Sequence, residues 1–331
     1  MTTDEITPGQ LLNISGSYWQ ACTLHAGVRL EIFTVIGEDR VSGEEIARRL
    51  AGDVRGVTTL LNALAAMGLL TKQGEQYANT EMSKTFLVKG SPRYIGYILM
   101  HHHYLVESWS RLHEAVTSGS PVRERPHDND EKRRESFLMG MFNLGMGLAP
   151  RVASQINLDG RHHLLDLGGG PGTYAIHFCL ANPELKGTVY DLATTRPFAL
   201  RTIEQFGLAD RIDFMAGNYL ENHIEGSYDV AWLSHILHGE SPEECQDIIR
   251  KVVAVLEPGG LILIHDFILE NTLDGPLFPA LFSLNMLLGT RKGRSYAEKQ
   301  IMEMLDGAGV REIRRISFQG PNDSGIIVGH V

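Results

Sequence analysis

The feature that most constrains the fold of this chain is a glycine-rich turn directly after a short apolar run. Residues Leu164 to Leu167 have the composition of a buried β-strand, Gly168 to Gly172 interrupt it, and 173–181 read as a helix. Glycines tolerate positive φ, and without a Cβ they let backbone amides approach a ligand closely. The sequence therefore predicts a strand–turn–helix unit whose turn contacts a ligand.

A second strand points to a nucleotide as that ligand. The apolar residues 188–190 are followed by Asp191, and in nucleotide-binding α/β folds an acid at this place hydrogen-bonds a ribose. Dinucleotide sites carry Gly-x-Gly-x-x-Gly, whereas Asp166 to Gly172 resembles the Asp-x-Gly-x-Gly-x-Gly signature of class I S-adenosylmethionine-dependent methyltransferases. This resemblance assigns Asp166, Gly168 and Gly170 to a cofactor site; a dinucleotide site or a plain turn is the alternative.

Length and charge limit the classes of protein to consider. The chain has 331 residues, more than a usual single domain, so we expect two domains. A net charge of -10 argues against nucleic acid or an anionic membrane as the main partner. The 3 cysteines form no C-x-x-C pair, residues 1–20 lack a signal-peptide pattern, and no apolar run reaches ~20 residues. We therefore expect a cytoplasmic protein.

Residues 1–100 are expected to form a winged-helix-like domain. Apolar residues recur at helical spacing over 11–36, a further helix covers 54–67, and 69–78 reads as a hairpin. A helix that reads DNA carries several basic side chains, but 54–67 contains few polar side chains and a single base, Arg55. We interpret this part as a packing module that joins two copies of the chain in a homodimer.

Residues 101–155 are expected to be linking helices that contribute to the pocket for a methyl acceptor. Three consecutive histidines cannot all face one metal, because neighbours on a helix point about 100° apart. They are read as packing or surface residues, with His102 facing an aromatic substrate as the alternative. The stretch 121–131 reads as a loop. From the Met- and Phe-rich stretch that follows, Met139 and Phe142 are candidate substrate contacts, although such stretches more often form core or interface.

Residues 156–331 alternate between strand and helix patterns, which predicts a mostly parallel sheet covered on both faces. Ligands of such sheets bind at the carboxyl ends of the strands. The polar residues and glycines expected at that edge are Gly168, Asp191, Asn218, Ser234, His238 and Asp266. Asn218 is placed to hydrogen-bond an adenine edge, and Tyr219 either packs on the adenine ring or is an ordinary core aromatic.

His238 is the candidate general base. A phenol with a pKa near ~10 is mostly protonated at neutral pH, so an imidazole with an ordinary pKa of ~6.5 is a suitable base. Asp266 ends the next strand, where its charge needs a partner, and pairing with His238 would orient the ring. His235 reads as structural. A metal site of His235, His238 and Asp266 is conceivable but lacks the spacing of known helical sites, so no metal is expected.

From Tyr18 to the end, the chain resembles the plant and bacterial small-molecule O-methyltransferases that carry a winged-helix dimerisation domain. The motifs that recur in order are the glycine turn, the acid at Asp191, the Gly-Asp pair matched by Gly217 and Asn218, and the Leu-His stretch around His238. This resemblance implies a Rossmann-like domain with a seven-stranded sheet, mostly parallel and with the last strand antiparallel. It also implies S-adenosylmethionine as cofactor, a homodimer, and His238 as base.

The resemblance extends to further site residues. The cofactor contacts that it implies are Asp166, Gly168, Gly170, Asp191, Leu192, Gly217, Asn218, Tyr219 and Ser234. Residues 281–288 match segments that line the acceptor pocket, with Phe282, Asn285 and Met286 as candidate contacts.

Several positions depart from the family pattern. The family's acid and tryptophan after the base are Gly239 and Glu240 here, its adenine-side aspartate is Asn218, and its lysine is Ser234. Gly293 lies in a segment that often supplies a second carboxylate to the base.

The leading hypothesis is an enzyme that methylates a hydroxyl of a small, aromatic or polyketide-like metabolite. One alternative keeps the S-adenosylmethionine donor but transfers the methyl group to carbon, nitrogen or sulfur. The other alternative is a ligand-sensing regulator that binds DNA through its winged helix. The shortage of basic side chains over 54–67 disfavours it.

Overall fold

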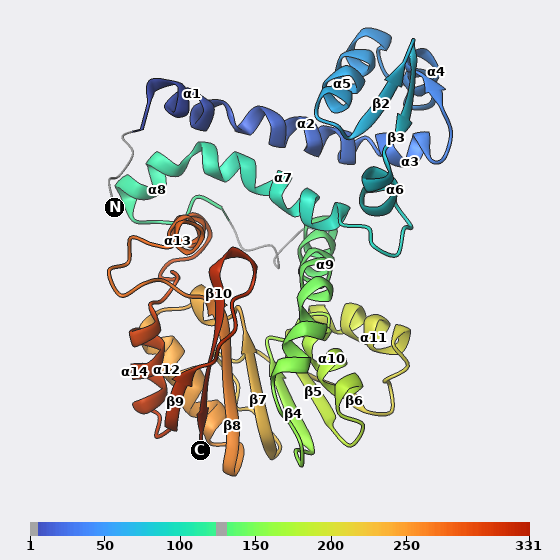
Figure 1. The fold of residues 1–331 in the computed structure, drawn as a ribbon. Helices are drawn as coiled ribbons and strands as arrows, with labels where there is room; N and C mark the ends of the chain where they lie inside the picture. The colour runs from blue at the N-terminus through green and yellow to red at the C-terminus, as the bar shows by residue number, and fades with distance from the viewer. Residues whose placement is uncertain (1–5, 124–130) are drawn as a thin grey trace. The chain divides into compact units, whose positions relative to one another are not determined.

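The computed structural model describes residues 6–123 and 131–331, and Figure 1 shows the chain as a ribbon. The chain divides into two compact units, Met1–Leu105 and Val106–Val331. The division falls inside one helix, α7 (Gly96–Ser110). Most of the loop expected over 121–131 lies outside the described residues.

The first unit is mostly helical and contains one small sheet. Besides the first part of α7, its helices are α1 (Pro8–Gly16), α2 (Tyr18–Arg29), α3 (Ile32–Ile36), α4 (Gly43–Arg49), α5 (Val54–Ala66) and α6 (Glu81–Leu87). The strands β1 (Val41–Ser42), β2 (Leu70–Gln73) and β3 (Gln76–Asn79) form an antiparallel sheet in the order β1-β3-β2. The expected hairpin is therefore confirmed as β2 and β3.

The single helix expected over 11–36 is wrong, because the structure divides this stretch into α1, α2 and α3. Where α1 ends, the Ser17 hydroxyl donates a hydrogen bond to the Ile14 carbonyl over 2.9 Å. Between α2 and α3, Glu31 adopts a left-handed φ of 53°. Such local polar and backbone features interrupt a helix without changing the spacing of its apolar residues.

Capping side chains fix where the helices of this unit begin. Ser42 accepts a hydrogen bond from the Glu45 N–H over 3.2 Å at the start of α4, and Asp53 accepts one from the Gly56 N–H over 2.8 Å at the start of α5. Each cap satisfies an N–H that has no partner within the first helical turn. The apolar faces of these helices and of the hairpin enclose a core of their own.

The second unit is built on one seven-stranded sheet. Its strands are β4 (His163–Leu167), β5 (Lys186–Asp191), β6 (Ile212–Ala216), β7 (Tyr228–Ser234), β8 (Leu256–Phe267), β9 (Arg311–Arg315) and β10 (Ser324–His330). Their order across the sheet is β6-β5-β4-β7-β8-β10-β9, and β10 runs antiparallel to both β8 and β9. The predicted sheet, mostly parallel with its last strand antiparallel, is confirmed.

Helices cover both faces of this sheet. They are α9 (Glu131–Gln155), α10 (Thr173–Ala181), α11 (Arg196–Gln205), α12 (Pro242–Val253) and α14 (Glu298–Asp306). The unit also contains α8 (Leu112–Ser118) and α13 (Leu277–Gly289), which contact each other. Successive strand residues point to opposite faces, so Leu164 joins the core under α9, α10 and α11, whereas Leu165 joins the core under α12 and α14. Figure 1 shows α9, α10 and α11 beside one half of the sheet and α12 and α14 beside the other half.

Two elements of this unit differ from the sequence-based expectation. Helix α13 was not expected, because Leu277–Gly289 is apolar nearly all round and lacks the one-sided pattern of a surface helix. The sequence pattern predicts a helix over 242–256 that is ended by 257–260 and a strand that starts at Leu261, but strand β8 already begins at Leu256 and includes 257–260. Strands β4 to β8 run parallel, so their carboxyl ends lie along one edge of the sheet.

Candidate active site

The glycine turn between β4 and α10 is shaped by positive backbone angles. Gly168 has a φ of 66° and Gly170 a φ of 54°, which side-chain-bearing residues rarely adopt. A Cβ on Gly168 would lie 2.5 Å from a methyl carbon of Ile236, so a larger residue does not fit there. The Gly168 N–H donates to the Tyr190 carbonyl over 2.8 Å and so ties the turn to β5.

Asp191, at the end of β5, is fixed against this turn. One carboxylate oxygen accepts a hydrogen bond from the Gly170 N–H over 2.8 Å. The other accepts from the Leu192 N–H over 2.7 Å and from the Thr195 hydroxyl over 2.9 Å. The structure therefore brings together three of the predicted cofactor residues, and their backbone and carboxylate groups face one another.

Asp166, one residue before the end of β4, is a buried acid with an unsatisfied oxygen. Its Oδ2 accepts a hydrogen bond from the Ala175 N–H over 3.1 Å, whereas its Oδ1 has no partner among the described residues. Burial raises the pKa of Asp166 to about 7, the Ala175 hydrogen bond works against this, and the charge of Asp191 adds to it. A donor or cation of a ligand would satisfy Oδ1.

The residues after β6 lie beside the same turn. The Gly217 N–H donates to the Asp191 carbonyl over 2.9 Å, which holds β6 and β5 together at this edge. Asn218 accepts a hydrogen bond from the Leu220 N–H over 3.1 Å through its side-chain oxygen. Tyr219 packs, partly buried, against the core under α12 and α14. A Cβ on Gly168 would lie 3.7 Å from its ring, so the core position of Tyr219 is also next to the turn.

Ser234, at the end of β7, belongs to a buried hydrogen-bond chain that the sequence did not indicate. Its hydroxyl lies 2.9 Å from His265 Nδ1, and the other ring nitrogen of His265 lies 3.2 Å from the Ser324 hydroxyl on β10. Burial holds the pKa of His265 well below its usual range, the nearby His235 adds to this, and Asp266 opposes it. A neutral histidine thus joins β7, β8 and β10.

His238 and Asp266 form the predicted imidazole–carboxylate pair. His238 Nδ1 lies 2.7 Å from Asp266 Oδ1, which also accepts a hydrogen bond from the Phe267 N–H over 2.8 Å. Burial alone would raise the pKa of Asp266, but the charges and hydrogen bonds of His238 and His235 outweigh it and hold that pKa well below its usual range. An ionised Asp266 requires the proton on Nδ1 and leaves Nε2 of His238 free to accept.

His235 also contacts Asp266. Its interpretation from sequence as a structural residue did not predict this contact. Its Nδ1 lies 3.5 Å from Asp266 Oδ1, and its backbone adopts a left-handed φ of 56°. One ligand atom from each of His235, His238 and Asp266 lies within 4.8 Å of the others, a grouping that could hold a metal ion. The sequence analysis considered this grouping but expected no metal, and the structure brings its three side chains together from separate parts of the chain.

Aromatic rings form one wall beside His238. The ring centroids of His238 and Phe282 are 4.7 Å apart in an edge-on arrangement, and Phe267 lies 4.7 Å from Phe282 and 4.9 Å from Phe278. Gly293 lies against the backbone of the same histidine: a Cβ there would come within 2.5 Å of the His238 carbonyl oxygen. Without rearrangement, the position therefore has no space for a carboxylate side chain.

The remaining predicted substrate residues do not all gather at His238. Asn285 and Met286 lie on α13, close to one helical turn beyond Phe282, and both are buried. Met139 instead contacts Arg201 of α11, with its sulfur 3.5 Å from the guanidinium. Phe142 is half-buried on α9, and His102 is exposed on α7 in the first unit.

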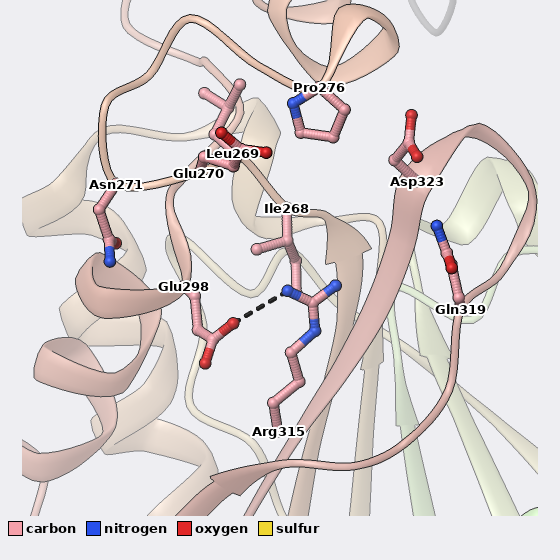
Figure 2. A pocket seen from close by; sticks show the side chains of 9 residues that line it. All are labelled: Ile268, Leu269, Glu270, Asn271, Pro276, Glu298, Arg315, Gln319 and Asp323. Carbon is pink, nitrogen blue, oxygen red and sulfur yellow. Dashed lines mark hydrogen bonds and ion pairs between the residues drawn. The ribbon is translucent and has the colours of Figure 1, made fainter. Parts of the chain in front are cut away.

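A cavity of about 410 Å³ lies at the end of β8, on the side of α14 and β9 (Figure 2). Arg315 crosses it and forms an ion pair with Glu298 over 2.9 Å. The cavity is lined by Ile268, Leu269, Glu270, Asn271, Pro276, Glu298, Arg315, Gln319 and Asp323. None of the predicted site residues lines it, so it is separate from the imidazole–carboxylate pair.

A parallel α/β sheet with a glycine turn, an acid on the next strand and a paired histidine at one edge defines a nucleotide-binding enzyme domain. Residues 111–311 match the O-methyltransferase domain family, and residues 12–89 match the O-methyltransferase dimerisation domain family. The chain therefore belongs to the S-adenosylmethionine-dependent O-methyltransferases. The non-enzymatic alternative, a DNA-binding regulator, receives no support from these matches.

Individual relatives are named as methyltransferases of oxygen or of nitrogen. The chain is 31% identical to 3-hydroxy-5-methyl-1-naphthoate 3-O-methyltransferase of Streptomyces sahachiroi, over 97% of this chain and 95% of the relative. It is 27% identical to the N,N-dimethyltransferase OxyT of Streptomyces rimosus, over 82% of each. The fold also matches human N-acetylserotonin methyltransferase in complex with S-adenosylmethionine, with a TM-score of 0.84 at 23% identity over 100% and 99% of the two chains.

The site has features that suit S-adenosylmethionine. This cofactor carries an ammonium group and ribose hydroxyls, and the site offers the unsatisfied Oδ1 of Asp166 and the carboxylate of Asp191. Gly170 has no atom within 4 Å of the place where a Cβ would stand, which leaves the turn open for close approach. No described helix is both long and apolar enough to cross a membrane.

Proposed function

We propose that the chain transfers the methyl group of S-adenosylmethionine to a hydroxyl of a small aromatic or polyketide-like metabolite, with His238 as general base. The observation that carries the proposal is the 2.7 Å contact between His238 Nδ1 and Asp266, next to a wall of phenylalanine rings. The aromatic wall suits a flat acceptor, and the free Nε2 suits removal of a hydroxyl proton.

The cofactor would be held along the edge formed by β4 to β7. The residues assigned to it are Asp166, Gly168, Gly170, Asp191, Leu192, Gly217, Asn218, Tyr219 and Ser234. Asp191 would accept from ribose hydroxyls, and Asp166 Oδ1 would accept from the ammonium group. Asn218 would face the adenine edge. When bound, S-adenosylmethionine supplies an electrophilic methyl group, so the main task of the protein is to position the acceptor in line with it.

His238 would accept the hydroxyl proton at Nε2, while its Nδ1–H stays hydrogen-bonded to Asp266. Asp266 is buried and ionised, so it stabilises the imidazolium that forms and keeps the ring in one orientation. Because Gly293 cannot carry a second carboxylate without displacing the His238 backbone, this pair would work with one acid, and His235 lies beside that acid instead.

A second candidate keeps the cofactor site but uses nitrogen as the accepting atom. It is favoured by the similarity to OxyT, named as an N,N-dimethyltransferase, and by the finding that Asp266 is the one acid paired with His238 within residues 6–123 and 131–331. Methyl transfer to carbon or sulfur by the same fold is a further version of it. Incubation with isotopically labelled methyl donor and paired aromatic alcohols and amines, with product mass spectrometry, separates these reactions. Labelling of amines alone would overturn the hydroxyl proposal.

We further propose that the first unit joins two chains in a homodimer and that the enzyme works in the cytoplasm on a free metabolite, without nucleic acid or membrane. Several large apolar side chains on α1 and the first turn of α2 are exposed: Leu11 56%, Leu12 72%, Ile14 65%, Tyr18 59% and Trp19 67%. Exposed apolar side chains that lie together like these usually mark an interface.

The free cysteines fit a reducing compartment. In this scheme 101–155 contributes to the acceptor pocket.

A further inference from the structure

Arg123 is a partly buried cation whose hydrogen-bond partners, among the described residues, are all neutral groups. Its guanidinium donates to the Ser108 hydroxyl over 3.1 Å, and to both the backbone carbonyl and the side-chain oxygen of Asn285 over 3.0 Å each. Among residues 6–123 and 131–331, no carboxylate forms an ion pair with it. Burial lowers the pKa of Arg123 to about 10, so its surroundings disfavour the positive charge.

Helix α13 binds the Arg123 side chain and also contacts the proposed base. Phe282 and Asn285 are three residues apart on α13, so they lie on one face about 4.5 Å apart along the axis. Phe282 contacts the His238 ring at 4.7 Å, and Asn285 binds the guanidinium. The base and the cation therefore contact α13 at two residues that are close to one helical turn apart.

The helix is also shaped to admit this side chain. A Cβ on Gly289 would lie 2.6 Å from Arg123 Nε, so a larger residue there would push the guanidinium away. The backbone N–H groups of Val122 and Arg123 both donate to the Leu288 carbonyl, over 3.0 and 3.2 Å. The arginine is thus fixed by its own backbone as well as by its side chain.

We propose that Arg123 binds a carboxylate of the methyl acceptor, so that the substrate is an aromatic hydroxy acid rather than a neutral phenol. This inference rests on the proposed methyl transfer to a hydroxyl. A carboxylate would supply the charge partner that the described surroundings of Arg123 lack, through donors of the guanidinium that Ser108 and Asn285 leave free. With the acid end fixed at Arg123, the hydroxyl of a short aromatic acid would be directed toward His238.

The competing explanation is structural: Arg123 could simply cap the carboxyl end of α13, where cations are favourable. If Arg123 is only a cap, its replacement lowers the stability of the protein and changes the Michaelis constants of all acceptors equally. A carboxylate-binding residue affects the Michaelis constant of acidic acceptors and leaves neutral ones nearly unchanged. Acceptor selectivity therefore separates the two explanations.

The test uses the intact protein and three probes that share one ring system: 3-hydroxy-1-naphthoate, its carboxamide and 2-naphthol. The acid should be methylated with a kcat/KM at least about tenfold above the other two, because a charge-assisted contact is lost with each neutral probe. Equal values for the three probes in the unaltered enzyme would overturn the inference and leave the methyltransferase proposal standing. Methylation of none of these or of any other aromatic hydroxyl would overturn both.

Variants refine the same test. Arg123→Gln should raise the KM for the acid by about 10- to 100-fold and leave that for 2-naphthol nearly unchanged, while Arg123→Lys should be intermediate because it keeps the charge but loses the planar fork. Arg250→Gln, at an exposed arginine paired with Asp247, is the matched control. If Arg123→Gln impairs both probes equally, Arg123 is a structural cap and the inference fails. If the variant does not fold, the probe comparison in the unaltered enzyme still decides.

Discussion

One ring nitrogen of His238 is hydrogen-bonded to Asp266, and the other is free to accept a proton. Replacing His238 should therefore affect turnover more than cofactor binding. His238→Ala should lower kcat by about 10²- to 10⁴-fold, the usual contribution of a general base, and leave the affinity for S-adenosylmethionine nearly intact. Steady-state kinetics and calorimetry measure the two quantities. His113→Ala, at an exposed histidine of α8, is the control. Unchanged turnover in the His238 variant would remove this residue from the mechanism.

The grouping of His235, His238 and Asp266 raises the question of a metal cofactor. Asp266 Oδ1 already accepts hydrogen bonds from His238 and from the Phe267 N–H, so this carboxylate oxygen and His238 Nδ1 have partners without a metal. We therefore expect full turnover after treatment with a strong chelator, with metal content checked by elemental analysis. Loss of turnover on chelation, followed by recovery on addition of Zn²⁺ or Co²⁺, would contradict a metal-independent reaction.

Asp166 should destabilise the ligand-free protein at neutral and higher pH. Burial raises the pKa of Asp166 to about 7. Between the usual pKa of an aspartate and pH 7, the folded chain therefore binds more protons than the unfolded chain. The free energy of unfolding falls as pH rises through that window. Asp166→Asn should therefore increase the free energy of unfolding near pH 8 by about 1–4 kcal/mol and change it little near pH 4. Urea unfolding at the two pH values measures this.

The same substitution should weaken cofactor binding, because an amide cannot offer a negative charge to the ammonium group. A stabilised Asp166→Asn variant with unimpaired affinity for S-adenosylmethionine would show that Oδ1 does not face the cofactor. A variant with the same loss of stability at both pH values would show that ionisation of the Asp166 carboxyl group does not destabilise the protein. Asp229→Asn, at an acid whose carboxylate binds the His162 and His163 N–H groups away from the turn, is the control.

The segment around Gly293 should tolerate no side chain, unlike the turn after the base. A Cβ on Gly293 would meet the His238 carbonyl at 2.5 Å, whereas a Cβ on Gly239 would meet nothing within 4 Å. Gly293→Ala should therefore shift His238 and lower kcat by about tenfold or more, since small displacements of catalytic groups are costly. Gly239→Ala should retain nearly full turnover. Equal behaviour of the two variants would show that His238 is not positioned by this packing.

The elements found from sequence are those whose signals are local and periodic. The glycine turn, the acid on β5 and the pairing of Asp266 on β8 with His238 after β7 were found because the apolar strand runs end in special residues. Parallel strands place such ends together. Helix α13 was missed because an apolar stretch without a polar face has no helical period. Contacts across long separations, such as His265 with Ser324 or Arg123 with Asn285, leave no mark in local sequence.

The molecule as a whole should depend on a second copy of itself. The exposed apolar residues of α1 and α2 lie in the first unit, whose residues 12–89 match the dimerisation domain family, whereas the imidazole–carboxylate pair lies in the second unit. Leu12 and Trp19 are 72% and 67% exposed in the single chain, and their contact with water would cost about 1.5–3 kcal/mol for each large apolar side chain left unburied. Association would remove that cost.

Leu12→Glu combined with Trp19→Glu should therefore convert the dimer to a monomer and lower the melting temperature, because two charges cannot be buried without partners in an apolar interface. Light scattering across a concentration series measures the mass of the unaltered chain and of the variant. Met82→Glu changes an exposed apolar residue of α6 outside this surface and should remain dimeric. If the unaltered chain has the mass of one copy at every concentration, the exposed residues on α1 and α2 are not a dimer interface, and whatever covers them in the cell must be a different molecule.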